Sequence, residues 1–114
     1  MTEKGNKDAK GVVFVGPLRY NNETKRITGK SLLNYENAVY TQLRNNNGKV
    51  TLKARGRATG RAIDVASILQ RKGFIEIGDI VIGSEEVEIE RKGEKRKSHI
   101  STIEIPLVEI KIKS

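Results

Sequence analysis

The chain has 114 residues with no Cys, no Trp and one His, and its 22 Lys and Arg against 14 Asp and Glu give a formal net charge of +8. This length predicts one domain, and the composition excludes a disulfide scaffold, a Cys/His zinc site and a Cys nucleophile. No apolar run reaches the ~18 residues of a membrane span, and residues 1–11 lack the hydrophobic stretch of a signal peptide. We therefore expect a soluble, cytoplasmic protein with no membrane partner. Such a charge excess points to a polyanionic partner, of which nucleic acid is the commonest.

The first half of the chain predicts a leader, a strand, a loop and a helix. Residues 1–11 are polar and typical of a flexible leader, whereas the apolar run 12–15 predicts a strand covered on both faces. Residues 17–29 show no hydrophobic period and are expected to form a long loop. Ser31 is placed to cap a helix whose apolar positions recur at three- and four-residue steps, and Gly48 is placed to end it.

The second half predicts a strand, a helix and two long strands. Apolar and polar residues alternate over 50–55, as in a half-buried strand, and a helical stripe of apolar residues follows and ends at Gly73. Residues 75–91 and 97–113 are alternating and β-branched, with the turn RKGE between them. At ~3.3 Å per residue these strands are longer than the helices beside them, so we expect the part over 86–101 to project as an arm. The predicted order is β-α-β-α-β-β.

The sharpest motif is the basic block KARGRATGRAID at 53–64. Over residues 44–72 eight Lys and Arg stand against one acidic residue, a net charge of +7. The strand part of the block presents cations to solvent, and the rest lies at a helix start, where unpaired N–H groups favour an anion. Guanidinium groups beside such a terminus suit phosphate oxygens, although a solvated charged loop is the alternative. The basic side chains that this block contributes are Lys53, Arg55, Arg57 and Arg61.

Three other patterns resemble catalytic or metal sites, and each has a simpler interpretation. The run TGKS at 28–31 resembles part of a phosphate-binding loop, but Thr24 stands where that motif needs a Gly. Lys30 is therefore predicted to be a phosphate contact or a solvated lysine. His99 lies in the expected arm, where no pocket is implied. The glutamates over 85–90 are expected to form ion pairs with lysines of the returning strand. We expect no catalytic residue, no metal and no cofactor.

Together these motifs resemble the Alba family of small basic DNA- and RNA-binding proteins of archaeal chromatin. The matching segments are VVFVG at 12–16, GKSLLNY at 29–35, KARGRA at 53–58, RAID at 61–64, IEIGDIVIGSE at 75–85 and STIEI at 101–105. The resemblance implies that 12–114 is a single nucleic-acid-binding domain of the α+β class. Its fold would be a two-layer βαβαββ sandwich, like the C-terminal domain of translation initiation factor three, with a protruding β-hairpin arm. A homodimer and dimer-to-dimer assembly on DNA are also implied.

The resemblance further implies three contact regions, namely the loop before the first helix, the RGR loop and the arm tip over 91–97. With the basic block, the predicted nucleic-acid-binding residues are Lys30, Asn34, Tyr35, Lys53, Arg55, Arg57, Arg61, Lys92, Lys95, Arg96 and Lys97. Segment 17–28 is an insertion relative to the family, and its secondary candidates are Arg19, Lys25 and Arg26. The family's adjacent lysine pair is replaced by Gly29 and Lys30, and Phe74 is the candidate for a family Phe used between dimers.

Two functions fit these observations. The first is a chromosome-associated architectural protein that coats or compacts double-stranded DNA without strong sequence preference, because phosphate contacts carry no base information. The alternative is an RNA-binding protein or ribonucleoprotein subunit of the same fold. An enzyme that acts on nucleic acid would need an acid–base or metal constellation, which the sequence does not offer.

Overall fold

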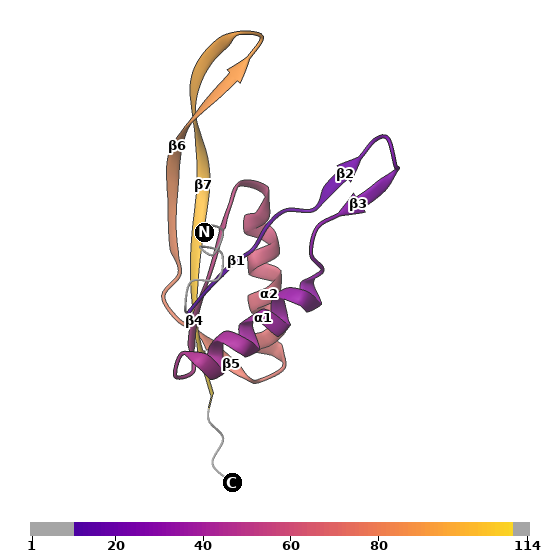
Figure 1. The fold of residues 1–114 in the computed structure, drawn as a ribbon. Coiled ribbons are helices and arrows are strands. Elements are labelled where there is room, and N and C mark those ends of the chain that lie inside the picture. The colour runs from indigo at the N-terminus through magenta and orange to yellow at the C-terminus, as the bar shows by residue number, and fades with distance from the viewer. Residues whose placement is uncertain (1–10, 111–114) are drawn as a thin grey trace.

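The computed structural model describes residues 11–110, which form one main sheet with two helices packed on one of its faces (Figure 1). Across this sheet the strands lie in the order β1 (Val12–Phe14), β4 (Lys49–Arg55), β7 (Glu94–Glu109) and β5 (Ile75–Ile77). Strand β6 (Val81–Arg91) also pairs with β7. The helices are α1 (Leu32–Asn45) and α2 (Thr59–Arg71), the latter preceded by the 3-10 turn η2 (Gly56–Ala58). These elements confirm the α+β class and the βαβαββ order.

Two expectations concern the ends of the chain. Nearly all of the leader predicted over 1–11, and residues 111–113 of the last predicted strand, lie outside the described residues. Gly11 is described and belongs to the fold, because its N–H donates to Gln42 Oε1 at 2.8 Å and its carbonyl accepts from Thr51 N at 2.8 Å. No helix within 11–110 is long and apolar enough to cross a membrane.

The core lies between the sheet and both helices. Strands β4 and β7 present alternate side chains to the helices, which are amphipathic, so each element buries one face against the others. The predicted stripe on α2 and the alternation in β4 are confirmed. Side chains with at most 1% of their surface exposed include Val39, Leu52, Ala62, Val65, Leu69, Ile75, Ile105 and Leu107.

Polar contacts cap the start of α1 and connect the two helices. As predicted, Ser31 caps α1, because its hydroxyl accepts from Asn34 N at 3.2 Å. Glu36 of α1 is only 5% exposed, and Lys72, at the end of α2, donates to its Oε1 at 2.8 Å. This hydrogen bond raises the pKa of Lys72 above its usual 10.5. A raised lysine pKa stabilises the folded state at neutral pH, and this contribution is lost only as the pH rises through the pKa of the folded state.

The prediction of a loop over 17–29 is wrong, because this segment forms a β-hairpin. Strands β2 (Arg19–Asn21) and β3 (Arg26–Thr28) pair antiparallel in a sheet of their own. The side chain of Asn21 organises the turn, since its Oδ1 accepts from Glu23 N at 2.8 Å and Thr24 N at 3.1 Å. Both strands of this hairpin are exposed on each face, so the sequence carries no buried face that alternates with a polar one, and its periodicity indicates a loop.

The prediction of a single strand over 75–91 is also wrong, because this segment is divided into β5 and β6. Ile77 pairs with Leu107 and Val81 pairs with Glu104, so four steps along one strand match three along β7. This extra residue is a β-bulge, which shifts by one position the side chains that lie on a given face of the sheet. β7 is continuous and begins at Glu94, earlier than the expected residue 97.

The projecting arm is confirmed. Strand β4 pairs with β7 only as far as Arg55 opposite Thr102, whereas β6 and β7 remain paired out to Arg91 opposite Glu94. The distal hairpin therefore has no third strand, and it extends away from the helices (Figure 1). The register sets Glu88 opposite Lys97, and Glu90 opposite Lys95, as expected. In the described part of the chain, neither pair closes to salt-bridge distance.

We predict that the arm can be shortened without loss of the fold. Replacing 87–98 by Asn-Gly joins Glu86 to His99, which already pair, and removes no residue of the core cluster. Thermal melting followed by circular dichroism should stay cooperative with a nearly unchanged midpoint. As a contrast, Leu52→Ala, at a side chain with 0% exposure, should lower stability by about 2–5 kcal/mol. A shortened protein that unfolds would show that the arm belongs to the core.

Candidate nucleic-acid interface

The ends of two strands and the starts of two helices meet at one edge of the sheet. Strands β1 and β4 are parallel, with Val12 opposite Thr51 and Phe14 opposite Lys53. Both strands therefore end on the same side, and each leads through a connection into a helix. The first turns of α1 and α2 contain no acidic residue. Helix N-termini carry partial positive charge, so this edge favours an anion before any side chain is considered.

The connection between β4 and α2 carries the RGR loop. Gly56 has a φ of 61°, a left-handed conformation that side-chain-bearing residues rarely adopt, and it lets the chain turn directly from strand into η2. Arg57 follows and is exposed. The residue before α2 is Ala58, which supplies no side-chain cap. The N–H groups at the start of α2 thus have no side-chain acceptor at the capping position, and that of Thr59 donates to the carbonyl of Gly56.

Arg61 and Tyr35 position the two helix starts. Arg61 donates to the carbonyl of Gly16 at 3.0 Å and to that of Lys30 at 2.6 Å, and its guanidinium lies 5.5 Å from the centre of the Tyr35 ring. Tyr35 is 6% exposed, and its hydroxyl accepts from Gly16 N at 2.9 Å. In this arrangement both side chains fix the loop before α1 to the start of α2, and a direct phosphate contact by either stays a prediction.

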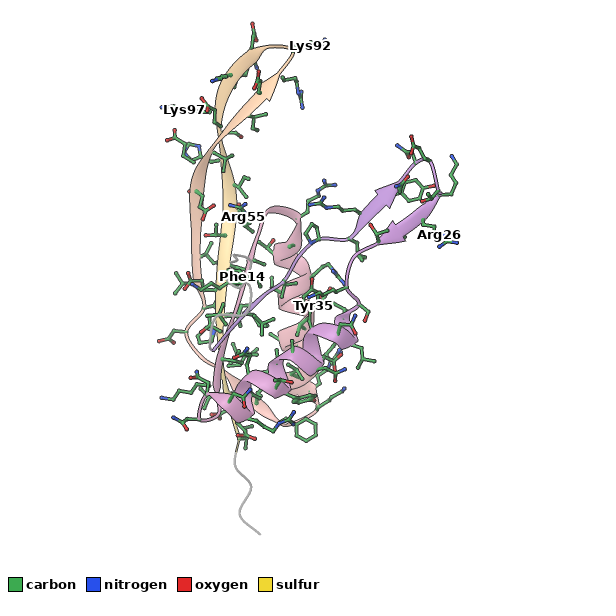
Figure 2. All side chains as sticks on the ribbon, in the orientation of Figure 1. Phe14, Arg26, Tyr35, Arg55, Lys92 and Lys97 are labelled. Atoms are coloured by element: carbon green, nitrogen blue, oxygen red, sulfur yellow. The ribbon has the colours of Figure 1, made fainter. Side chains whose placement is uncertain are left out.

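An open groove of about 930 Å³ lies at this edge, between the base of the arm and the connections that follow β1 and β4. Its floor includes the aromatic ring of Phe14, which is 46% exposed. Four of the predicted cations line the groove, namely Arg19, Lys30, Lys53 and Arg55. Figure 2 shows Arg55 between the arm and the rest of the domain. The structure therefore brings together cations that lie far apart in the sequence.

Two carboxylates in the groove neutralise part of this charge. Arg55 donates to Glu85 at 2.8 Å, and Lys53 lies 3.8 Å from Glu104. Both pairs are largely exposed and connect β4 to the arm strands. Sequence reasoning missed Glu85 and Glu104 as groove residues, because no local pattern reveals a pair between residues 30 positions apart, as Arg55 and Glu85 are.

The remaining predicted residues lie outside the groove lining. Asn34 is exposed on the first turn of α1. The basic residues of the arm are exposed at its far end, where Figure 2 shows Lys92 and Lys97. These arm residues are Lys92, Lys95, Arg96 and Lys97. Lys25 and Arg26 are exposed on the β2–β3 hairpin. Their contacts with nucleic acid stay predictions.

The fold and the groove define a two-layer α+β domain with a cationic edge and an arm, and comparison with known proteins assigns its family. Residues 23–84 match the family model for Alba. The "DNA/RNA-binding protein Alba" of Nanoarchaeum equitans is 45% identical over 82 residues, which cover 69% of this chain and 89% of the relative. That of Methanocella arvoryzae is 41% identical over 96 residues, covering 82% and 84%. The solved structure of Alba from Thermoplasma volcanium superposes with a TM-score of 0.64 at 33% identity, covering 85% of this chain and 98% of that one. The chain belongs to the Alba family.

The ion pair between Arg55 and Glu85 predicts that removing the carboxylate of Glu85 raises the affinity for DNA. Glu85→Gln frees Arg55 and removes a negative charge from the groove, while the exposed ion pair that is lost is worth at most about 1 kcal/mol. Binding to a DNA duplex, measured by fluorescence anisotropy at low salt, should tighten by about two- to fivefold. The matched control is Glu76→Gln on β5, outside the groove lining, which should change affinity less. Weaker binding by Glu85→Gln would mean that Glu85 orients Arg55.

Proposed function

We propose that this protein binds double-stranded DNA through its phosphate backbone, without strong sequence preference, as an architectural protein of the chromosome. The observation that carries the proposal is the meeting of two helix N-termini with Lys30, Arg55 and Arg57 at one edge of the sheet. Phosphate oxygens suit guanidinium groups and unpaired backbone N–H groups alike. The relatives' printed name, "DNA/RNA-binding protein Alba", supports the same class of ligand.

The arm extends the proposed binding surface. It projects from the same edge, and exposed Lys and Arg gather at its tip. A two-stranded hairpin without further support is marginally stable in water, so we expect the arm to gain order when it lies along a groove of the duplex. Chemistry on the ligand is not part of the proposal, because His99 is exposed on the arm opposite Glu86 and does not line the groove.

The proposal predicts a steep dependence of affinity on salt. Each phosphate contact that is lost should lower the slope of log affinity against log salt by about 0.9, so replacing Arg55 and Arg57 together by Ala should lower it by about 1.8. Two duplexes of unrelated sequence should lose affinity alike. The matched control is Arg44→Ala with Arg71→Ala, which removes the same charge from the last turns of α1 and α2. Equal affinity at low and high salt, or one strongly preferred sequence, would contradict the proposal.

A homodimer is the second part of the proposal. At the base of β6 three consecutive apolar side chains are exposed, with Ile80 at 47%, Val81 at 56% and Ile82 at 77%. Exposed apolar side chains gathered in one short segment support a contact site, and Val81 and Ile82 present them on both faces of the strand. Phe74, 48% exposed with an edge-to-face contact to Tyr40 at 6.0 Å, is available for the further contact between dimers.

Light scattering should therefore give twice the chain mass of 12.7 kDa. Ile82→Glu places a charge in the exposed apolar segment and should yield the monomer, with little effect on a core to which Ile82 does not belong. Ile89→Glu is the control, because Ile89 is an exposed residue of the same type farther out on the arm, at 43%, and it should leave the dimer intact. A parent protein that scatters as a monomer would exclude the dimer.

RNA is the second candidate ligand, because the relatives' printed name gives DNA and RNA alike. A-form RNA has a wide, shallow minor groove and 2′-hydroxyl groups, so an arm that fits B-DNA closely would fit it differently. To separate the two candidate ligands, we would measure the affinity for a DNA duplex and for an RNA duplex of the same sequence. Each duplex is tested with the parent protein and with the protein whose arm is shortened. A larger loss on RNA would favour the RNA role.

A further inference from the structure

The β2–β3 hairpin is a second projection, close in the chain to the cationic edge. It leaves the domain after Pro17 and returns at Gly29, whose φ is 126° and whose Cα faces the carbonyl of Pro17 so closely that an added Cβ would lie 2.9 Å from that oxygen. Figure 1 shows it extending away from the helices on a different course from the arm. All of its residues from Leu18 to Lys30 are exposed.

The two faces of this hairpin differ in chemistry. Tyr20 pairs directly with Ile27, so both side chains lie on one face, with 58% and 66% of their surfaces exposed. Successive residues of a strand alternate between faces, so Arg19 and Arg26 belong to the other face. Within 11–110, no recorded aromatic or cation–π contact involves Tyr20. The hairpin therefore presents a flat aromatic–aliphatic surface backed by guanidinium groups.

Charge and continuity indicate what covers this surface. Residues 18–30 contain Arg19, Lys25, Arg26 and Lys30 against Glu23 alone, four positive charges minus one negative, or +3. Arg19 and Lys30 also line the groove described above, so the hairpin continues the proposed DNA-binding edge. An exposed ring on one face of a narrow two-stranded hairpin and long cationic side chains on the other fit a strand of nucleic acid that wraps around the hairpin, with a base stacked on the ring and the flanking phosphates beside the cations.

We infer that the β2–β3 hairpin binds an unpaired nucleotide, which stacks on Tyr20 beside Ile27 while its flanking phosphates contact Arg19, Lys25 or Arg26. The ring of a tyrosine needs the open face of a base, and in a continuous duplex that face is covered by the neighbouring base pairs. The ligand of this site is therefore a single-stranded end, gap or bulge next to the duplex held in the groove. This inference rests on the proposed function and adds a site for unpaired bases to it.

The test compares a blunt DNA duplex with the same duplex carrying a short single-stranded extension. The parent protein should bind the extended probe about tenfold more tightly, within the range for one stacked base. Tyr20→Val should lose this gain and keep its affinity for the blunt duplex, whereas Tyr20→Phe should keep both. A fluorescent purine analogue in the extension should be quenched on binding to the parent and to Tyr20→Phe only. Extensions of thymidine and of uridine nucleotides distinguish a DNA from an RNA strand.

Tyr20→Val is chosen because a β-branched residue keeps the strand and its aliphatic contact with Ile27. Cross-strand NMR contacts between positions 20 and 27 check that the hairpin still forms. Arg26→Ala should lower the salt slope on the extended probe, whereas the matched control Arg71→Ala at the end of α2 should leave it unchanged.

Equal affinity of the parent protein for both probes would overturn the inference, and so would a Tyr20→Val variant that keeps the gain with an intact hairpin. A change in the oligomeric state of the Tyr20→Val variant would also overturn it, because this face would then be a contact between copies of the chain. Loss of all duplex binding by the parent would instead defeat the proposed function, so the two failures are distinguishable.

Discussion

The parallel pairing of β1 with β4 is the constraint on which the cationic edge depends. Two parallel strands end on the same side, and since each leads into a helix packed on one face, the starts of both helices come to that side as well. Strand pairing alone does not hold the helix starts at a fixed separation. Arg61 does this by donating to carbonyls of the β1–α1 connection at 3.0 and 2.6 Å. Arg61 therefore acts on the backbone, and losing its side chain would loosen both helix starts together.

The net charge of the chain is a poor measure of how strongly this groove attracts an anion. The chain carries +8 overall, yet two of the cations that line the groove have carboxylate partners, Glu85 and Glu104. Exposed ion pairs are weak and are screened further by salt. On the proposed function, phosphate would displace these carboxylates at little cost, while in the unbound protein the carboxylates limit repulsion among clustered cations. On the proposed function, we expect binding strength to depend on the exchange of partners at Arg55 and Lys53 more than on the count of basic residues.

Periodicity and capping predicted most of the fold, because the signals for both helices and for β4 are local. Ser31 caps α1 through a neighbour three residues away, and β4 alternates within its own length. The two errors have another origin. The hairpin over 17–29 is organised by one Asn side chain, and the bulge between β5 and β6 is visible only against β7. For the candidate site, residue type predicted the cations, but only the structure shows Tyr35 buried and Arg61 bound to backbone carbonyls.

The core and the two hairpins occupy separate parts of this molecule. The most deeply buried side chains, such as Val39, Leu52 and Leu69, lie between the helices and the middle of the sheet, away from both hairpins. Each hairpin has only its own cross-strand pairs to order it, and such pairs contribute about 0.2–1 kcal/mol each. On the proposed function, contacts with a polyanion would therefore add order where folding supplies little of it. We therefore expect substitutions on either hairpin that keep its turn to change affinity without unfolding the domain, because the core contributes no side chain to the outer part of either projection.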